Sequence, residues 1–205
     1  ETFEVENNPT DPSAGTHEIT FSRECWIEAD DFMAEPIPKY KRLFPGGPEC
    51  RLKGAYLIKC VGYETDENGN VTEIAAEYDP DSRGGDPADG RKVKGATIHW
   101  VDAATAIDAE VRVYSELFSD PAPDGADKDF LACMNPDSLE TLTGCKVEAR
   151  MRDVAAEYDK TEKQGKTAPS FQFMRLGYFC LDNKDCSADH LVFNRSVTLK
   201  DSFKV

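Results

Sequence analysis

Short stretches in which apolar and polar residues alternate recur along the whole chain, and this period of two predicts β-strands. Many of these stretches are about five to eight residues long, with turn-favouring residues between them. Residues 66–70 (DENGN) separate two of these stretches and predict a β-hairpin. The predicted strands cover residues 17–21, 25–27, 56–63, 71–78, 97–101, 110–114, 171–180 and 191–199.

Helical patterns are scarce in the same chain. One surface helix is predicted around residues 150–160, which are charged and contain alanine. Residues 121–125 (PAPDG) are the strongest linker candidate. Many short strands with almost no long amphipathic helix predict an all-β protein, a sandwich or barrel, and we favour two small barrels.

The charge of the chain is acidic but unevenly distributed. The 205 residues carry a formal net charge of −15. Residues 39–59 hold six cationic side chains and one anionic side chain, Glu49, so this basic region carries +5 and the rest of the chain −20. A basic region in an acidic chain indicates either a solvated strand face or an anion site, for which a phosphate backbone is the best candidate. The acidic total argues against general coating of nucleic acid.

Several side chains of the basic region could contact an unpaired RNA or DNA strand. Arg42, Arg51 and Lys53 can donate hydrogen bonds to base edges or phosphates. Tyr40 could stack on a base. Tyr56 could do the same, but it lies in a predicted strand and is expected in the core.

A second candidate lies in residues 171–179 (FQFMRLGYF). Alternation places Gln172 on one face with Met174, Leu176 and Tyr178, and places Arg175 with the phenylalanines on the other. An amide among apolar neighbours offers the donor and the acceptor that a base reader needs. The alternative interpretation is a glutamine at a solvated sheet edge.

The sequence lacks the patterns of several other functions. It contains neither a G-x-x-x-x-G-K-[ST] nor a G-x-G-x-x-G motif. Its acidic residues cluster in loops, where water keeps them ionised, so a glycosidase pair is not expected. The three histidines sit in unlike contexts, and His99 is predicted to be structural rather than catalytic.

The seven cysteines show no C-x-x-C spacing, and we expect free thiols in a reducing cytoplasm. Cys180, Cys186 and His190 fit no common zinc motif, so no metal site is expected. No apolar run reaches the roughly 18 residues of a membrane helix. Because the chain starts at Glu1 without a signal peptide, we expect a fragment of a longer protein.

Taken together, these stretches make the chain similar to the C-terminal anticodon-binding part of glutaminyl-tRNA synthetases. The matching runs keep their order over nearly all of the chain. They are residues 21–23 (FSR), 40–43 (YKRL), 51–56 (RLKGAY), 89–95 (DGRKVKG), 98–101 (IHWV), 135–139 (NPDSL), 171–173 (FQF), 177–180 (GYFC) and 192–195 (VFNR).

The resemblance implies two antiparallel β-barrels of the kind seen in a ribosomal protein that binds 5S RNA, with few short helices. It implies a discontinuous proximal barrel from residues 1–36 and 119–205 and a distal barrel from residues 37–118. The anticodon loop would lie across both barrels with its three bases unstacked into separate pockets.

The resemblance also implies roles for individual residues. Arg51 would contact the first anticodon base, Gln172 the middle uridine and Arg42 the third base. Supporting backbone or pocket contacts would come from Lys41, Lys53 and Arg175, and a looser contact near the anticodon stem would come from Asn7.

The resemblance further implies that the fragment is not itself an enzyme. It would belong to a monomeric, cytoplasmic glutamine–tRNA ligase, with ATP and Mg²⁺ bound only by a catalytic domain outside the fragment. The expected partners are glutamine tRNA and that domain. The alternatives are the barrel domain of a eukaryotic- or archaeal-type glutamyl-tRNA synthetase and a β-sandwich that binds sugar or protein.

Overall fold

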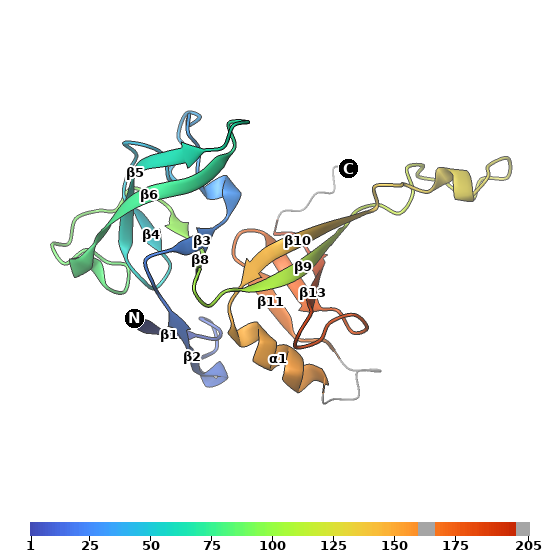
Figure 1. Cartoon of the computed structure of the whole chain (residues 1–205). Helices are drawn as coiled ribbons and strands as arrows, with labels where there is room; N and C mark the ends of the chain where they lie inside the picture. The colour runs from blue at the N-terminus through green and yellow to red at the C-terminus, as the bar shows by residue number, and fades with distance from the viewer. Residues whose placement is uncertain (160–166, 200–205) are drawn as a thin grey trace. The chain divides into compact units, whose positions relative to one another are not determined.

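The computed structural model describes residues 1–159 and 167–199 and consists mainly of β-strands, which confirms the predicted all-β class (Figure 1). In the described part, one α-helix is present, α1 (Arg150–Asp159), where the sequence predicts a helix; Lys160 lies outside the described residues. The strands are β1 (Thr2–Glu6), β2 (Thr16–Thr20), β3 (Cys25–Ile27), β4 (Cys50–Leu52), β5 (Leu57–Thr65), β6 (Val71–Asp79), β7 (Thr97–Ile98), β8 (Trp100–Asp102), β9 (Ile107–Tyr114), β10 (Leu139–Val147), β11 (Ser170–Phe173), β12 (Gly177–Leu181) and β13 (Leu191–Val197).

Contacts divide the chain into two compact units, unit 1 (Glu1–Thr105) and unit 2 (Ala106–Val205). This places β9 in unit 2, whereas the expected distal barrel includes it with residues 37–118. The grouping of residues 1–36 with residues 119–205 stays a prediction, because it concerns packing between the two units. No helix among the described residues is both long and apolar enough to cross a membrane.

Unit 1 contains three small sheets. Strands β1 and β2 form one hairpin, β3 pairs with β8, and the third sheet has the order β6-β5-β4-β7. Strands β5 and β6 pair antiparallel on either side of the turn at residues 66–70, which confirms the predicted hairpin. Asp66 closes this turn by accepting hydrogen bonds from the backbone N–H groups of Asn68 (2.9 Å) and Asn70 (2.8 Å).

Aromatic side chains fill much of the core of unit 1. The ring of Phe21 lies 6.0 Å from that of Phe3, 5.3 Å from that of Tyr56 and 5.2 Å from that of Trp100. Tyr56 is only 4% exposed, so the prediction that it belongs to the core is confirmed. These rings come from β1, β8 and the turns beside β2 and β5, and they tie the small sheets of unit 1 together.

Unit 2 is built on one five-stranded sheet with the order β10-β9-β13-β12-β11. Helix α1 covers its core through Ala155 and Tyr158, which are 1% and 6% exposed. Strands β9 and β13 are parallel, as are β4 and β7 of unit 1. The expectation of purely antiparallel sheets is therefore wrong at these two pairs. None of the described sheets closes on itself, and the barrels stay a prediction.

Residues 171–180 form a hairpin rather than the single strand that the sequence predicts. Strand β11 pairs antiparallel with β12, so that Gln172 lies opposite Tyr178 and Phe171 lies opposite Phe179. Arg175 occupies the turn with a φ of 67°, in the left-handed region. The residues on both sides of the turn are mostly apolar, and residues 171–180 contain neither proline nor asparagine to mark it.

The linker predicted at residues 121–125 is also reassigned. These residues lie in the long loop that joins β9 and β10, inside unit 2 (Figure 1). Proline and glycine mark the end of regular structure here, but the chain returns to the same sheet, as the pairing of Leu139 with Tyr114 shows. The division between the units falls instead at residues 105 and 106, after β8.

Candidate nucleic-acid interface

Arg42 is held against the short 3₁₀ helix η2 (Ala29–Asp31). Its Nη1 donates a hydrogen bond to the carbonyl oxygen of Asp30 at 2.9 Å, and its Nε lies 3.3 Å from Oδ1 of the buried Asp31. The side chain remains 33% exposed. The Tyr40 hydroxyl also lies beside this guanidinium, which is therefore anchored at η2 while part of the side chain stays open to solvent.

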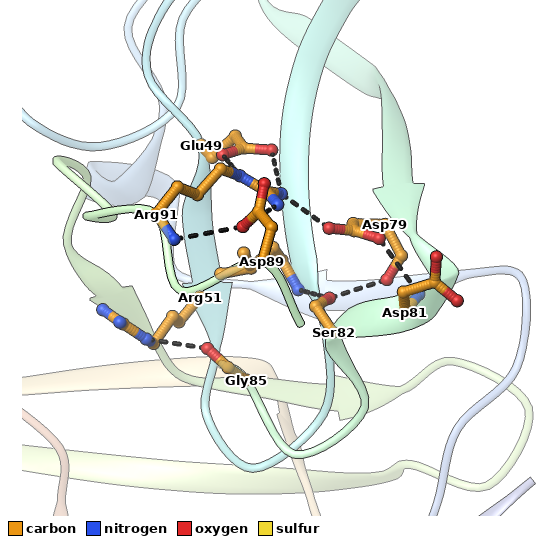
Figure 2. Close-up of polar contacts among 9 residues, drawn as sticks. Glu49, Arg51, Asp79, Asp81, Ser82, Gly85, Asp89 and Arg91 are labelled. Atoms are coloured by element: carbon orange, nitrogen blue, oxygen red, sulfur yellow. Dashed lines mark hydrogen bonds and ion pairs between the residues drawn. The ribbon is translucent and has the colours of Figure 1, made fainter. Parts of the chain in front are cut away.

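Arg51 has a comparable arrangement on β4 (Figure 2). Its Nε donates to the carbonyl oxygen of Gly85 at 2.8 Å, and its Nη2 pairs with the exposed carboxylate of Asp86 at 3.2 Å. Within the described part of the chain, Nη1 makes no hydrogen bond. A guanidinium fixed in this way can present its remaining donors to an acceptor such as a base edge.

Two predicted lysines lie near these arginines in unit 1. Lys41 precedes Arg42, and Lys53 follows β4 by one residue. Both side chains are exposed, and neither forms an ion pair or a hydrogen bond to the described residues. The basic region therefore contains fixed arginines and unpaired lysines, which is suited to binding a polyanion.

The loop between β6 and β7 supplies the carbonyl oxygen of Gly85 that binds Arg51. The sequence does not predict the contacts of Arg91 that hold this loop in place. Arg91 donates to both carboxylate oxygens of Glu49, at 2.9 Å and 2.8 Å, and also binds Asp79 (2.6 Å) and Asp89 (3.0 Å) (Figure 2). Hydrogen bonds from Arg91 lower the pKa of the Glu49 and Asp79 carboxyls. The clustering of residues 91–94 (RKVK) is visible in the sequence, but two of the partners of Arg91, Asp79 and Glu49, lie 12 and 42 positions away.

Gln172 lies on β11 at the edge of the sheet in unit 2. Its side chain is exposed, and its amide makes no hydrogen bond to any described residue. Its cross-strand neighbour Tyr178 is 44% exposed and shares the same face. An amide beside an aromatic ring combines hydrogen bonding with a stacking surface, the two means by which unpaired bases are recognised.

The other predicted contacts differ in their surroundings. Arg175 is partly buried in the turn between β11 and β12. Asn7 donates to the carbonyl oxygen of Ala14 at 2.7 Å and contacts Nδ1 of His17 through its Oδ1 at 2.8 Å. The amide of Asn7 thus holds the loop between β1 and β2, so its contact with RNA stays a prediction.

The remaining sequence expectations concern stacking, metals and thiols. Tyr40 is partly buried and donates to the carbonyl oxygen of Asp30 at 2.7 Å, so it also braces η2. No group of three or more His, Cys, Asp or Glu side chains suited to a metal ion is found in the described part of the chain. All seven cysteines are free, and burial raises the pKa of Cys25 and Cys50 to about 11.

Comparison with known proteins bears on both units. Two profiles of the family described as "tRNA synthetases class I (E and Q), anti-codon binding domain" match residues 1–79 and residues 97–182. Proteins named "Glutamine--tRNA ligase" match the whole chain. That of Bordetella avium (strain 197N) is 50% identical over 204 residues, which are 99% of this chain and 32% of that protein.

Two further relatives carry the same name. That of Clostridioides difficile (strain 630) is 48% identical over 204 residues, 100% of this chain and 34% of the relative. That of Aliivibrio fischeri (strain MJ11) is 49% identical over 203 residues, 99% of this chain and 34% of the relative. The chain thus spans about a third of the length of the curated relatives that it matches.

Proposed function

Because the chain belongs to the family of anticodon-binding domains of class I tRNA synthetases (E and Q), we propose that it binds the anticodon loop of glutamine tRNA and reads its bases. The observation that carries the proposal is near-50% identity, over the whole chain, to proteins named as glutamine–tRNA ligases. Partly exposed arginines in unit 1 and an exposed amide in unit 2 support it.

Each base has a proposed reader. Arg51 contacts the first anticodon base, Gln172 the middle uridine and Arg42 the third base. Lys41 and Lys53 neutralise backbone phosphates, to which an ammonium group is suited because it is a compact point charge. Arg175 supports the middle-base pocket, and Asn7 contacts the RNA near the anticodon stem.

The proposed mechanism of selection is the cost of unmatched polar groups. Bases leave their stack and are tested by hydrogen bonds to side chains that are already fixed. A wrong base leaves a donor or acceptor buried without a partner, at about 1–3 kcal/mol for each position. The hydrogen bonds of Arg42 and Arg51 to backbone carbonyl groups keep the two guanidinium groups in place for this test.

The remaining parts of the proposal concern the longer protein. We propose that it is a cytoplasmic, monomeric glutamine–tRNA ligase that couples ATP cleavage to charging of tRNA. ATP and Mg²⁺ would be bound by a catalytic domain outside this chain, which would be the second partner of the fragment. Identity to relatives of which the chain covers about a third supports this arrangement.

A binding comparison tests the proposed function. We expect the 205-residue chain to retain glutamine tRNA on a filter more tightly than a version of the same tRNA with a swapped anticodon. Equal retention of the two RNAs would contradict anticodon reading. A salt-independent affinity would contradict phosphate binding and would favour a β-sandwich that binds sugar or protein.

Single substitutions test which residue recognises which anticodon base. Arg42→Ala, Arg51→Ala and Gln172→Ala are each expected to reduce discrimination at one anticodon base by about 1–3 kcal/mol. Arg152→Ala is the control, because Arg152 is an exposed residue of α1. If a substitution weakens binding equally for all anticodon variants of the tRNA, the residue contacts the RNA backbone rather than a base. Unchanged selectivity in Gln172→Ala would favour a glutamyl-tRNA synthetase domain.

A further inference from the structure

A short segment of unit 1, residues 91–96, is fixed at its first residue by carboxylates. Arg91 uses all three of its guanidinium nitrogens: Nε and Nη2 bind Glu49, Nη2 also binds Asp79, and Nη1 binds Asp89 (Figure 2). Ion pairs that share one guanidinium restrict both its position and its rotamer. We call residues 91–96 the strap.

The other end of the strap is fixed by its backbone. The N–H of Gly95 donates to the carbonyl oxygen of Glu49 at 3.1 Å, and the N–H of Ala96 donates to that of Lys41 at 2.7 Å. A Cβ atom at Gly95 would lie 2.2 Å from the oxygen of Glu49, so the strap runs in direct contact with the backbone at the start of β4. Only glycine permits this approach.

Between these two ends the strap presents two lysines to solvent. Lys92 and Lys94 are exposed, whereas Arg91 and Val93 are partly buried. Neither lysine forms an ion pair or a hydrogen bond with any described residue. The chain has 39 Asp and Glu residues against 24 Lys and Arg residues, yet none of the carboxylates that the structure describes pairs with either lysine. Two ammonium groups on a fixed backbone form a positive site that is open to an anion.

The strap also adjoins the proposed readers. Its last residue, Ala96, accepts a hydrogen bond from the N–H of Arg51 at 3.1 Å, and β7 then runs parallel to β4 with Thr97 beside Arg51. The backbone of Lys41 contacts the strap as well. The backbone that carries Lys92 and Lys94 therefore leads directly into the strand pair that holds Arg51.

We propose that Lys92 and Lys94 form a phosphate-binding surface for the RNA strand next to the base bound by Arg51. The inference rests on the proposed function and extends it to two residues that make no base contact. An ammonium group attracts phosphate oxygens with little dependence on sequence. The strap therefore contributes affinity and salt dependence, and it leaves the choice of anticodon to other side chains.

The double variant Lys92→Gln/Lys94→Gln tests this assignment. The measurement is the affinity of the 205-residue chain for glutamine tRNA over a range of salt concentrations, with the anticodon-swapped tRNA in parallel. The plot of log K against log salt has a negative slope. Loss of two phosphate contacts should make this slope shallower by about 1.4, at about 0.7 for each single-strand phosphate. The affinity ratio between the two tRNAs should stay the same.

The control is Arg152→Gln/Lys184→Gln, which removes the same charge outside the basic region. Arg152 is an exposed residue of α1, and Lys184 lies in the exposed turn after β12. This variant should keep the slope of the unaltered chain. Equal slopes in the strap variant and the unaltered chain, or a changed anticodon preference, would overturn the inference while leaving anticodon binding intact. Failure of the unaltered chain to bind either tRNA would instead reject the proposed function.

Discussion

A guanidinium that is already bound to protein oxygen atoms loses less conformational freedom when it meets a ligand. Arg42 and Arg51 are bound in this way, each through a backbone carbonyl oxygen and a carboxylate. Their carboxylates differ, because Asp31 is buried and Asp86 is 89% exposed. The pair between Arg51 and Asp86 contributes little energy, so Asp86 can yield its place to a base at small cost.

Arg175 offers a test of backbone strain at a residue with a proposed role. Its φ of 67° suits glycine better than any residue with a Cβ atom. Arg175→Gly is therefore expected to be about 1 kcal/mol more stable to urea than Arg175→Ala, while both variants bind tRNA more weakly. The order should reverse for Arg152 inside α1, where alanine is favoured over glycine by about 1 kcal/mol. Equal stabilities of the two Arg175 variants would argue against strain in this turn.

At the scale of elements, the short strand β4 carries more of the proposed interface than its three residues suggest. It pairs antiparallel with β5 and parallel with β7, and the strap lies against the residue that precedes it. Arg51 is the middle residue of β4, between the buried Cys50 and Leu52. The packing of these neighbours fixes the direction in which Arg51 leaves the sheet.

Gly95→Ala probes the contact between the strap and the start of β4. A methyl group at this position would collide with backbone atoms, which cannot rotate away, so we expect a loss of about 1–3 kcal/mol in the free energy of unfolding. The matched control is Gly62→Ala, because a Cβ atom there meets nothing within 4 Å. Urea unfolding measures both variants. A stability close to that of the unaltered chain for Gly95→Ala would mean that the strap can lift away from Glu49.

Arg91 makes part of the stability dependent on pH. Its side chain lowers the folded-state pKa of Glu49 from 4.5 and that of Asp79 from 3.8. The pKa of Asp89 is lowered from 3.8 first by the backbone N–H of Arg91 and then by its side chain. Carboxyls with a lowered folded pKa stabilise the protein above their unfolded pKa, and the stabilisation is lost as the pH falls through the folded pKa. Removal of Arg91 should therefore cost most stability above about pH 5 and progressively less in acid.

The comparison of Arg91→Met with Arg152→Met measures this effect. Urea midpoints of the two variants should differ most near neutral pH, and the difference should shrink as the pH falls below the ordinary carboxyl range. The exposed Arg152 supplies the baseline because it forms no ion pair with the described residues. A difference that stays constant over the whole pH range would show that Arg91 acts through packing alone.

At the scale of the whole molecule, the two units have separate hydrophobic cores. The first strand, β1, contributes Phe3 to the core of unit 1 through its contacts with Phe21 and Tyr56. We therefore expect a fragment of residues 1–105 to fold alone and to keep the near-ultraviolet circular dichroism of its aromatic cluster. If residues 1–36 are disordered in this fragment, the result would instead support the prediction that they form one barrel with residues 119–205.

Most of the fold follows from local pattern. The hairpin at 66–70, helix α1 and most strands are predicted correctly, because alternation and turn residues act over a few positions. Errors arise where local signals are ambiguous. Arg175 turns the chain inside a mostly apolar stretch, and the prolines of residues 121–125 interrupt a sheet without ending a unit.

The sequence by itself determined the all-β class, the acidic total, the basic region around Arg42 and Arg51 and, through family motifs, the candidate readers. Only the tertiary structure decided which of these charged side chains already pair with other groups of the protein. Asp31 and Gly85 hold the two arginines, and Glu49 holds Arg91, whereas Lys92 and Lys94 pair with none of the described residues. The physical reason is that charge and hydrogen-bond donors are properties of single residues, but their partners depend on which distant segments pack together.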